Sequence, residues 1–203
     1  MSPLAATADE QLMSAYAHGD ASAFETLYDR HAARVWRYIL RSIGDPAAAD
    51  ELSQEVWFSV ARQAGRYAPR ASAPGLPLAR FSTWLFTLAR HRVVDHLRAT
   101  RPQASLDAPA GGDGEGDGPT LADTLAAPSG FGPLRRIETR QQAARLLAAL
   151  DALPPEQRDA FLLQAEAGMS VADIAAATGV PFETAKSRLR YARAALRRTL
   201  EDM

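Results

Sequence analysis

Apolar side chains in the first half of the chain recur at intervals of three and four residues, which is the period of one face of an α-helix. The first such series, which predicts a buried helix face, consists of Phe24, Leu27, Tyr28, His31, Val35 and Ile39. A second helix is predicted to begin at Pro46, because Asp45 is a favourable N-cap residue and proline is favoured at the first helical position. A third helix is predicted over residues 82–97.

The same period returns in the second half of the chain. It predicts one helix over residues 134–150 and another that starts at the adjacent prolines 154 and 155 and ends before Gly168. Ser170 and Asp173 have the spacing of a capping box, and Gly179 and Pro181 separate the short helix that follows from a longer one. A helix, a glycine turn and a second helix at this length predict a helix-turn-helix. Because no segment shows sustained alternation of apolar and polar residues, we expect an all-α protein.

Residues 102–133 interrupt the helical pattern. They are rich in proline, glycine and acidic residues and contain no lysine or arginine. Such a segment buries too little apolar surface to offset the entropy lost on ordering, so a flexible acidic linker is expected. We therefore expect two small helical domains, residues 12–101 and 137–203, joined by a linker over residues 102–136.

Composition narrows the classes of protein that remain. Cysteine is absent, which excludes disulfides and thiolate metal sites and suits a cytoplasmic protein. No apolar run approaches the ~18 residues of a membrane helix, so no membrane insertion is expected. The formal net charge of -1 is an average over unlike segments and does not argue against a nucleic-acid partner.

The last predicted helix carries two stripes. The apolar stripe is Ala185, Leu189, Ala192 and Leu196, and the basic stripe, one residue later, is Lys186, Arg190, Arg193 and Arg197. Because a step of one residue turns about 100° around a helix, the basic stripe should face solvent. Positive charge on the second helix of a helix-turn-helix fits binding in the major groove of DNA. The alternative is a basic helix that binds another protein.

An acidic cluster precedes three large apolar residues in the second predicted helix, and it allows three interpretations. The cluster is Asp50, Glu51, Gln54 and Glu55, followed by Val56, Trp57 and Phe58. It could be a docking face for a basic partner, with aromatic anchors inside an acidic rim. It could be a carboxylate pair for metal or acid–base chemistry, or simply a solvated acidic face. No histidine lies at metal-ligand spacing in this stretch, and an isolated His91–Asp95 pair is a weak candidate, so no metal and no cofactor are expected.

Aromatic and basic residues are concentrated between residues 80 and 101. The aromatic residues are Phe81, Trp84 and Phe86, and the basic ones are Arg80, Arg90, Arg92, Arg98 and Arg101. Rings that stack on bases and cations that follow phosphates are what proteins use to hold single-stranded nucleic acid. The alternative for the rings is a core stripe of Phe81, Trp84, Leu85 and Leu88, which explains the arginines less well.

Four motifs in this order resemble the extracytoplasmic-function (ECF) subfamily of the sigma-70 family of bacterial RNA polymerase sigma factors. They are DELSQEVWFSV, FSTWLFTLARHRVVDHLR, LPPEQRDAFLL and MSVADIAAATGVPFETAKSRLRYARAAL. The resemblance implies a non-enzymatic subunit that directs RNA polymerase core enzyme to promoter DNA. It implies that residues 12–101 are sigma region 2, that residues 137–203 are region 4, and that the linker threads the polymerase cleft. An inhibitory anti-sigma factor is a usual partner in this family.

The resemblance also implies three sets of site residues. Those that would bind core polymerase are Asp50, Glu51, Gln54, Glu55 and Phe58. Those that would hold the melted −10 element are Arg66, Tyr67, Arg80, Phe81, Trp84, Arg90, His91, Arg92 and Arg98. Those that would bind the duplex −35 element are Lys186, Ser187, Arg190 and Tyr191 at base-facing positions and Thr184, Arg188 and Arg193 at phosphate-facing positions.

The chain departs from the family pattern at a few positions. His91 replaces a usual asparagine, the order of Asp50 and Glu51 is reversed, and the loop around residues 71–78 is longer than usual, so −10 specificity does not transfer. Two other functions are compatible with the residues alone. One is a stand-alone helix-turn-helix regulator with an unrelated N-terminal sensor domain, and the other is a metal-dependent nucleic-acid enzyme.

Overall fold

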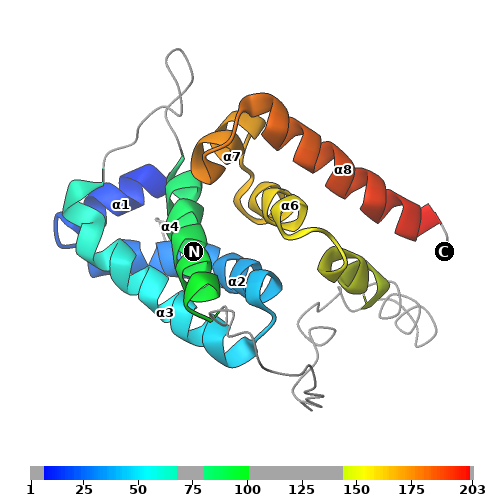
Figure 1. Cartoon of the computed structure of the whole chain (residues 1–203). Coiled ribbons are helices and arrows are strands. Elements are labelled where there is room, and N and C mark those ends of the chain that lie inside the picture. The colour runs from blue at the N-terminus through cyan, green and yellow to red at the C-terminus, as the bar shows by residue number, and fades with distance from the viewer. Residues whose placement is uncertain (1–6, 68–79, 101–143, 202–203) are drawn as a thin grey trace, which may run out of the picture.

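The computed structural model describes residues 7–67, 80–100 and 144–201 (Figure 1). The expected linker over residues 102–136 and the lengthened loop over residues 71–78 lie outside these residues. The N-terminal domain contains α1 (Asp9–Ala17), α2 (Ala21–Ile43), α3 (Pro46–Gln63), a short 3₁₀ helix (Ala64–Arg66) and α4 (Phe81–Thr100). The C-terminal domain contains a helix over residues 144–151, then α6 (Pro155–Ala167), α7 (Val171–Thr178) and α8 (Phe182–Glu201). Every regular element in the described residues is a helix, which confirms the all-α fold.

Capping side chains fix where the N-terminal helices begin and end. Asp45 accepts a hydrogen bond from the backbone N–H of Ala47 at 2.9 Å, and Pro46 is the first residue of α3, as predicted. Asp20 caps α2 in the same way. Helix α2 ends at Ile43, and Gly44, which follows it, has a φ of 78° in the left-handed region that favours glycine.

Helix α1 was not predicted from the sequence, and a partly buried cluster of polar side chains fixes it to α2. The Asp9 carboxylate accepts a hydrogen bond from Arg30 Nη1 at 2.6 Å and lies 2.7 Å from His31 Nε2. On the same helix Leu12 and Met13 are fully buried. Nine residues give too few turns for a clear period, which is why the pattern alone does not reveal α1.

The predicted buried face of α2 is correct except at its N-terminal end. Leu27, Val35 and Ile39 are fully buried and His31 nearly so, against the interior of α3 and α4. Tyr28, however, is 46% exposed, so the prediction that it belongs to the core is wrong. Its ring lies at the groove between α2 and α3, where it packs against Trp57 of α3.

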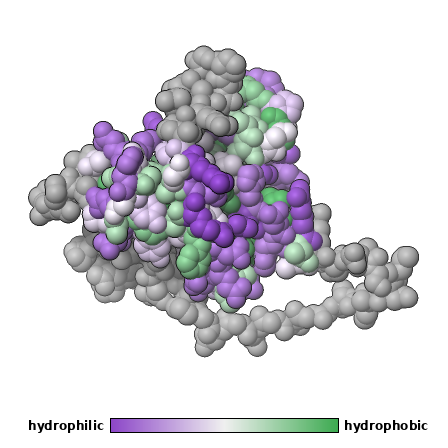
Figure 2. Space-filling view, turned by 90° about the vertical axis from the view of Figure 1, so that its left-hand side faces the viewer, coloured by the Kyte–Doolittle hydropathy of each residue, from purple (hydrophilic) through white to green (hydrophobic). Residues whose placement is uncertain are grey.

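The C-terminal domain contains the predicted helix-turn-helix. Ser170 and Asp173 form both hydrogen bonds of the capping box at the start of α7, and Gly179 ends that helix with a φ of 68°. The predicted apolar stripe of α8 is buried, and it consists of Ala185, Leu189, Ala192 and Leu196. On the face of the molecule shown in Figure 2, hydrophilic residues cover much of the described surface and hydrophobic residues appear in patches between them.

The two domains pack against each other. Helix α6 lies against α2 and α4 on one side and against α7 and α8 on the other (Figure 1). The buried apolar residues of α6, such as Leu163, continue the core that begins in the N-terminal helices. The described residues therefore form one compact arrangement in which α6 is the link between the domains.

Candidate functional site

A groove lined largely by aromatic and apolar side chains lies between α2 and α3. Its volume is about 570 Å³, and we call it the aromatic groove. Its lining includes Phe24, Tyr28, Trp36, Arg37, Asp50, Gln54, Trp57 and Phe58. Phe58 is 66% exposed, whereas Trp57 is buried and forms the floor, with ring contacts to Phe24 at 5.8 Å and to Tyr28 at 5.0 Å. An exposed ring above a rigid aromatic floor is a common form of protein-binding surface.

Polar side chains of α3 lie at the edge of the aromatic groove and beside it, and we call this set the acidic rim. Asp50 and Gln54 line the groove itself, and Glu51 and Glu55 lie on the same helix. Asp50, Glu51, Gln54 and Glu55 are all exposed on α3. Trp36 Nε1 donates a hydrogen bond of 2.7 Å to Asp50 Oδ1, which holds that carboxylate at the edge of the groove. Sequence reasoning missed Trp36, although its spacing of eight residues from Tyr28 places both on one face of α2.

Glu51 and Glu55, the possible catalytic pair, have no metal-ligand neighbours. Across residues 7–67, 80–100 and 144–201, no group of three or more His, Cys, Asp or Glu side chains could hold a metal ion. Glu55 instead lies 3.7 Å from Arg92 Nε.

The aromatic residues expected to contact single-stranded DNA differ in accessibility. Phe81 is fully buried, with its ring 5.5 Å from His31 and 5.8 Å from Trp84. Tyr67 and Trp84 are partly exposed and lie 5.0 Å apart. Phe81 therefore supports these two rings from below and is not accessible to a base in this conformation.

Tyr67 carries a perturbed hydroxyl. Burial, together with the nearby carboxylates of Glu10 and Asp9, raises the pKa of Tyr67 to about 12. The hydroxyl has no hydrogen-bond partner among the described residues. Tyr67 thus stays neutral throughout the physiological pH range, and its hydroxyl is buried although the residue as a whole is partly exposed.

The basic residues of the same region divide into exposed and engaged groups. Arg66, Arg80, His91 and Arg98 are exposed. Arg92 Nη2 donates to Ser59 Oγ at 3.1 Å. Arg90 is turned towards the C-terminal domain, where it contacts Asp159 and the backbone of α7.

The basic face of α8 is accessible, as its two stripes predict. Lys186, Arg190, Tyr191 and Arg193 are exposed, while Thr184, Ser187 and Arg188 are partly buried. The Arg190 guanidinium lies over the Tyr191 ring, 4.9 Å from its centroid, and such stacking orders both side chains. Arg193 hydrogen-bonds to Gln164 on α6.

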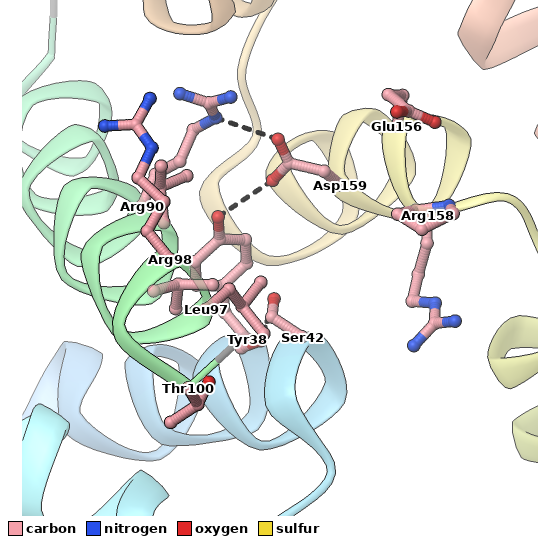
Figure 3. A pocket seen from close by; sticks show the side chains of 12 residues that line it. Tyr38, Ser42, Arg90, Leu97, Arg98, Thr100, Glu156, Arg158 and Asp159 are labelled. Atoms are coloured by element: carbon pink, nitrogen blue, oxygen red, sulfur yellow. Dashed lines mark hydrogen bonds and ion pairs between the residues drawn. The ribbon is translucent and has the colours of Figure 1, made fainter. Parts of the chain in front are cut away.

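A second cavity of about 570 Å³ lies where the two domains meet. In Figure 3 the Tyr38 hydroxyl and the Arg90 side chain both point towards the Asp159 carboxylate, at 2.8 Å each. Burial, reinforced by the Asp159 charge, raises the pKa of Tyr38 well above its ordinary value of 10.0. Sequence reasoning missed this cluster, because Asp159 lies far along the chain from both partners and no local pattern relates them.

No helix in the described ranges has the length and apolar character needed to cross a bilayer.

Comparison with known proteins identifies two family domains in the chain. Residues 27–103 match sigma-70 region 2, and residues 143–196 match sigma-70 region 4. Among curated proteins, the chain is similar to the RNA polymerase sigma factor CarQ of Myxococcus xanthus, with 33% identity over 94% of this chain and 97% of CarQ. It is also similar to the ECF RNA polymerase sigma factor SigL of Mycobacterium tuberculosis, with 32% identity over 94% of this chain and 96% of SigL.

Two solved structures share the fold. One is CnrH in complex with the cytosolic domain of CnrY, with a TM-score of 0.59, 22% identity and coverage of 96% of this chain and 97% of CnrH. The other is the sigma factor RpoE of Bartonella quintana in complex with the anti-sigma factor NepR, with a TM-score of 0.59, 20% identity and coverage of 88% and 96%. With both sigma-70 regions present and relatives matched along nearly their whole length, the chain belongs to the ECF subfamily of sigma-70 RNA polymerase sigma factors, which direct transcription initiation at promoters.

Proposed function

We propose that this sigma factor binds core RNA polymerase through the aromatic groove and its acidic rim. The observation that carries the proposal is the 66% exposure of Phe58, which lines the groove with Asp50 and shares α3 with the exposed carboxylates of Glu51 and Glu55. An apolar anchor inside a charged rim combines affinity with orientation, because the ring loses water on docking while the charges select a basic partner.

We further propose that the two domains read promoter DNA in different ways. Melted −10 DNA would contact the partly exposed rings of Tyr67 and Trp84, the arginines at positions 66, 80, 90, 92 and 98, and His91, with Phe81 as buried support. Duplex −35 DNA would contact α8, with Lys186, Ser187, Arg190 and Tyr191 at bases and Thr184, Arg188 and Arg193 at phosphates.

Catalysis in this proposal belongs to the polymerase, and the sigma factor itself is not an enzyme. Its place of action is the cytoplasm, where bacterial polymerase meets promoters. Both structural relatives were solved with another protein bound, and one of these proteins is named an anti-sigma factor. An anti-sigma factor is accordingly a proposed partner of this chain.

Run-off transcription with sigma-free core polymerase tests the proposal. Replacing Asp50, Glu51 and Glu55 together with alanine should abolish both core binding and promoter-specific transcripts. As a control, Glu25 and Asp29, which are exposed acidic residues on α2 rather than on α3, are replaced with alanine, and this variant should behave as wild type. A wild-type chain that binds DNA but never supports initiation would instead indicate a stand-alone regulator.

A further inference from the structure

The exposed side of α8 begins with a phenylalanine that the proposed DNA contacts do not include. Phe182 is the first residue of the helix, and 49% of its surface is exposed. It belongs to neither of the two apolar clusters that the described residues form. Single apolar side chains are common on protein surfaces, so exposure alone assigns no role to this ring. Its position on the helix and the residues beside it decide what it does.

Phe182 extends the basic stripe of α8 by one turn towards the N-terminus. The stripe consists of Lys186, Arg190, Arg193 and Arg197, all of which are exposed. At 100° per residue, each of these four side chains leaves the helix within about 80° of Phe182. The apolar stripe of α8 lies on the opposite side, buried in the domain. A molecule that binds along the basic stripe therefore also meets the Phe182 ring.

The residue after the ring shows which part of a DNA duplex suits the first turn of α8. Glu183 is the single acidic residue of the helix before Glu201. Its side chain is 75% exposed, and its carboxylate lies 3.4 Å from Lys186 Nζ. A carboxylate at this position repels a phosphate, and a phenyl ring offers a phosphate no hydrogen bond. The first turn of α8 therefore suits base edges, which is where the N-terminal residues of a recognition helix bind.

Thymine is the base whose major-groove edge carries an apolar group, the C5-methyl group. The remaining groups on the edges of the base pairs are hydrogen-bond donors and acceptors, and a phenyl ring placed over them would remove their bonds to water without replacing them. We propose that Phe182 is a base-reading residue that contacts the C5-methyl group of one thymine, so that α8 recognises a thymine in addition to the bases read by its basic stripe. The inference rests on the proposed binding of α8 to duplex −35 DNA.

The helix geometry limits where this thymine lies. Phe182 precedes Lys186 by four residues, which is about 6 Å along the axis of α8. Because successive base pairs are about 3.4 Å apart, the thymine should lie within about two base pairs of the base that Lys186 contacts. The proposal thus concerns one thymine at one edge of the −35 element.

Replacing thymidine with deoxyuridine tests the contact, because it removes only the methyl group and keeps every hydrogen bond of the base pair. Holoenzyme assembled from the full chain and sigma-free core polymerase first selects promoters from fragments of the bacterium's own genome. A labelled synthetic promoter duplex that carries a selected sequence is then titrated with holoenzyme, and each −35 thymidine is replaced in turn. At one position the replacement should weaken wild-type binding about fourfold, which corresponds to the burial of one methyl group.

The matching protein variant is Phe182→Ala. It should bind the thymidine and deoxyuridine duplexes with equal affinity, because no ring is left to contact the methyl group. Phe182→Leu keeps an apolar side chain and should keep about a twofold preference for thymidine, which also shows that the position tolerates substitution. Leu97→Ala removes an exposed apolar side chain from α4 and is the control that should keep the full preference.

The outcomes separate this inference from the proposed function. If no −35 thymine shows a methyl dependence with wild-type holoenzyme, or if the dependence persists in Phe182→Ala, the inference is wrong. It is also wrong if the contacted thymine lies far from the base whose identity Lys186→Ala ceases to select. Run-off transcription from the selected promoters by wild-type holoenzyme would uphold the proposed function in each of these cases. A wild-type chain that selects no promoter would overturn both.

Discussion

The ring of Phe58 gives the sharpest quantitative test of the aromatic groove, and the change is Phe58→Ala. A phenylalanine side chain carries about 200 Å² of surface, so the 66% that is exposed corresponds to roughly 130 Å². If docking on polymerase covers this area, the lost burial at about 25 cal/mol per Å² is ~3 kcal/mol. Since 1.4 kcal/mol is about tenfold in affinity, the dissociation constant for core polymerase should rise about a hundredfold.

Fluorescence anisotropy of the labelled chain, titrated with sigma-free core polymerase, measures that constant. Leu97→Ala is the control, because Leu97 is also exposed, at 42%, but lies on α4 away from the groove. Most of the Phe58 ring is in solvent in the free protein, so circular dichroism should show a folded variant. Binding of Phe58→Ala within threefold of wild type would refute the assignment of the groove to polymerase.

Two further predictions concern the Asp9 cluster and the basic face of α8. Burial alone would raise the pKa of Asp9, but hydrogen bonds and charges from His31 and Arg30 outweigh it and hold the pKa below the ordinary 3.8. A lowered pKa in the folded state stabilises the fold above the unfolded pKa, and this contribution is lost as the pH falls through the folded value. Asp9→Asn should therefore lower the free energy of unfolding at neutral pH by about 1.5–3 kcal/mol. Urea titrations measure this difference between the variant and the wild type. A difference that does not become smaller below about pH 4 would contradict this account. Arg190→Ala should weaken the binding free energy by about 1–3 kcal/mol for duplexes that carry the matching −35 base and by much less for other duplexes. An equal loss of binding on every sequence would make Arg190 a phosphate contact.

Local features of the structure could be predicted from the sequence because each depends on residues close together in the chain. The cap at Asp45, the capping box of Ser170 and Asp173, and the turn at Gly179 are all where the pattern placed them. The buried and basic stripes of α8 follow from one helical period. The all-α fold could be predicted because each of these local patterns specifies a helix or the end of one.

Features that depend on packing between distant segments could not be predicted. The spacing of Phe81 fits a core position and a base-stacking position equally well, and only the packing of α4 on α2 shows that it is buried. Tyr28 fits the apolar period of α2, yet its ring contacts Trp57 at the edge of a groove that only two packed helices create. In the sequence, Asp159 cannot be distinguished from an ordinary polar residue near the start of a helix. Its hydrogen-bond partners Tyr38 and Arg90 become visible only in the folded structure.

Three successive side chains of α2 make bonds to other helices. They are Trp36, Arg37 and Tyr38, with acceptors Asp50 on α3 and Glu166 and Asp159 on α6. Because the side chains of successive residues in a helix point about 100° apart, this short stretch of α2 contacts both the aromatic groove and the interface between the two domains. A single-residue insertion or deletion upstream of this stretch in α2 would turn all three side chains away at once. Among related proteins that close in the same way, positions 37 and 166 should therefore change charge as a pair, while the length of α2 stays constant.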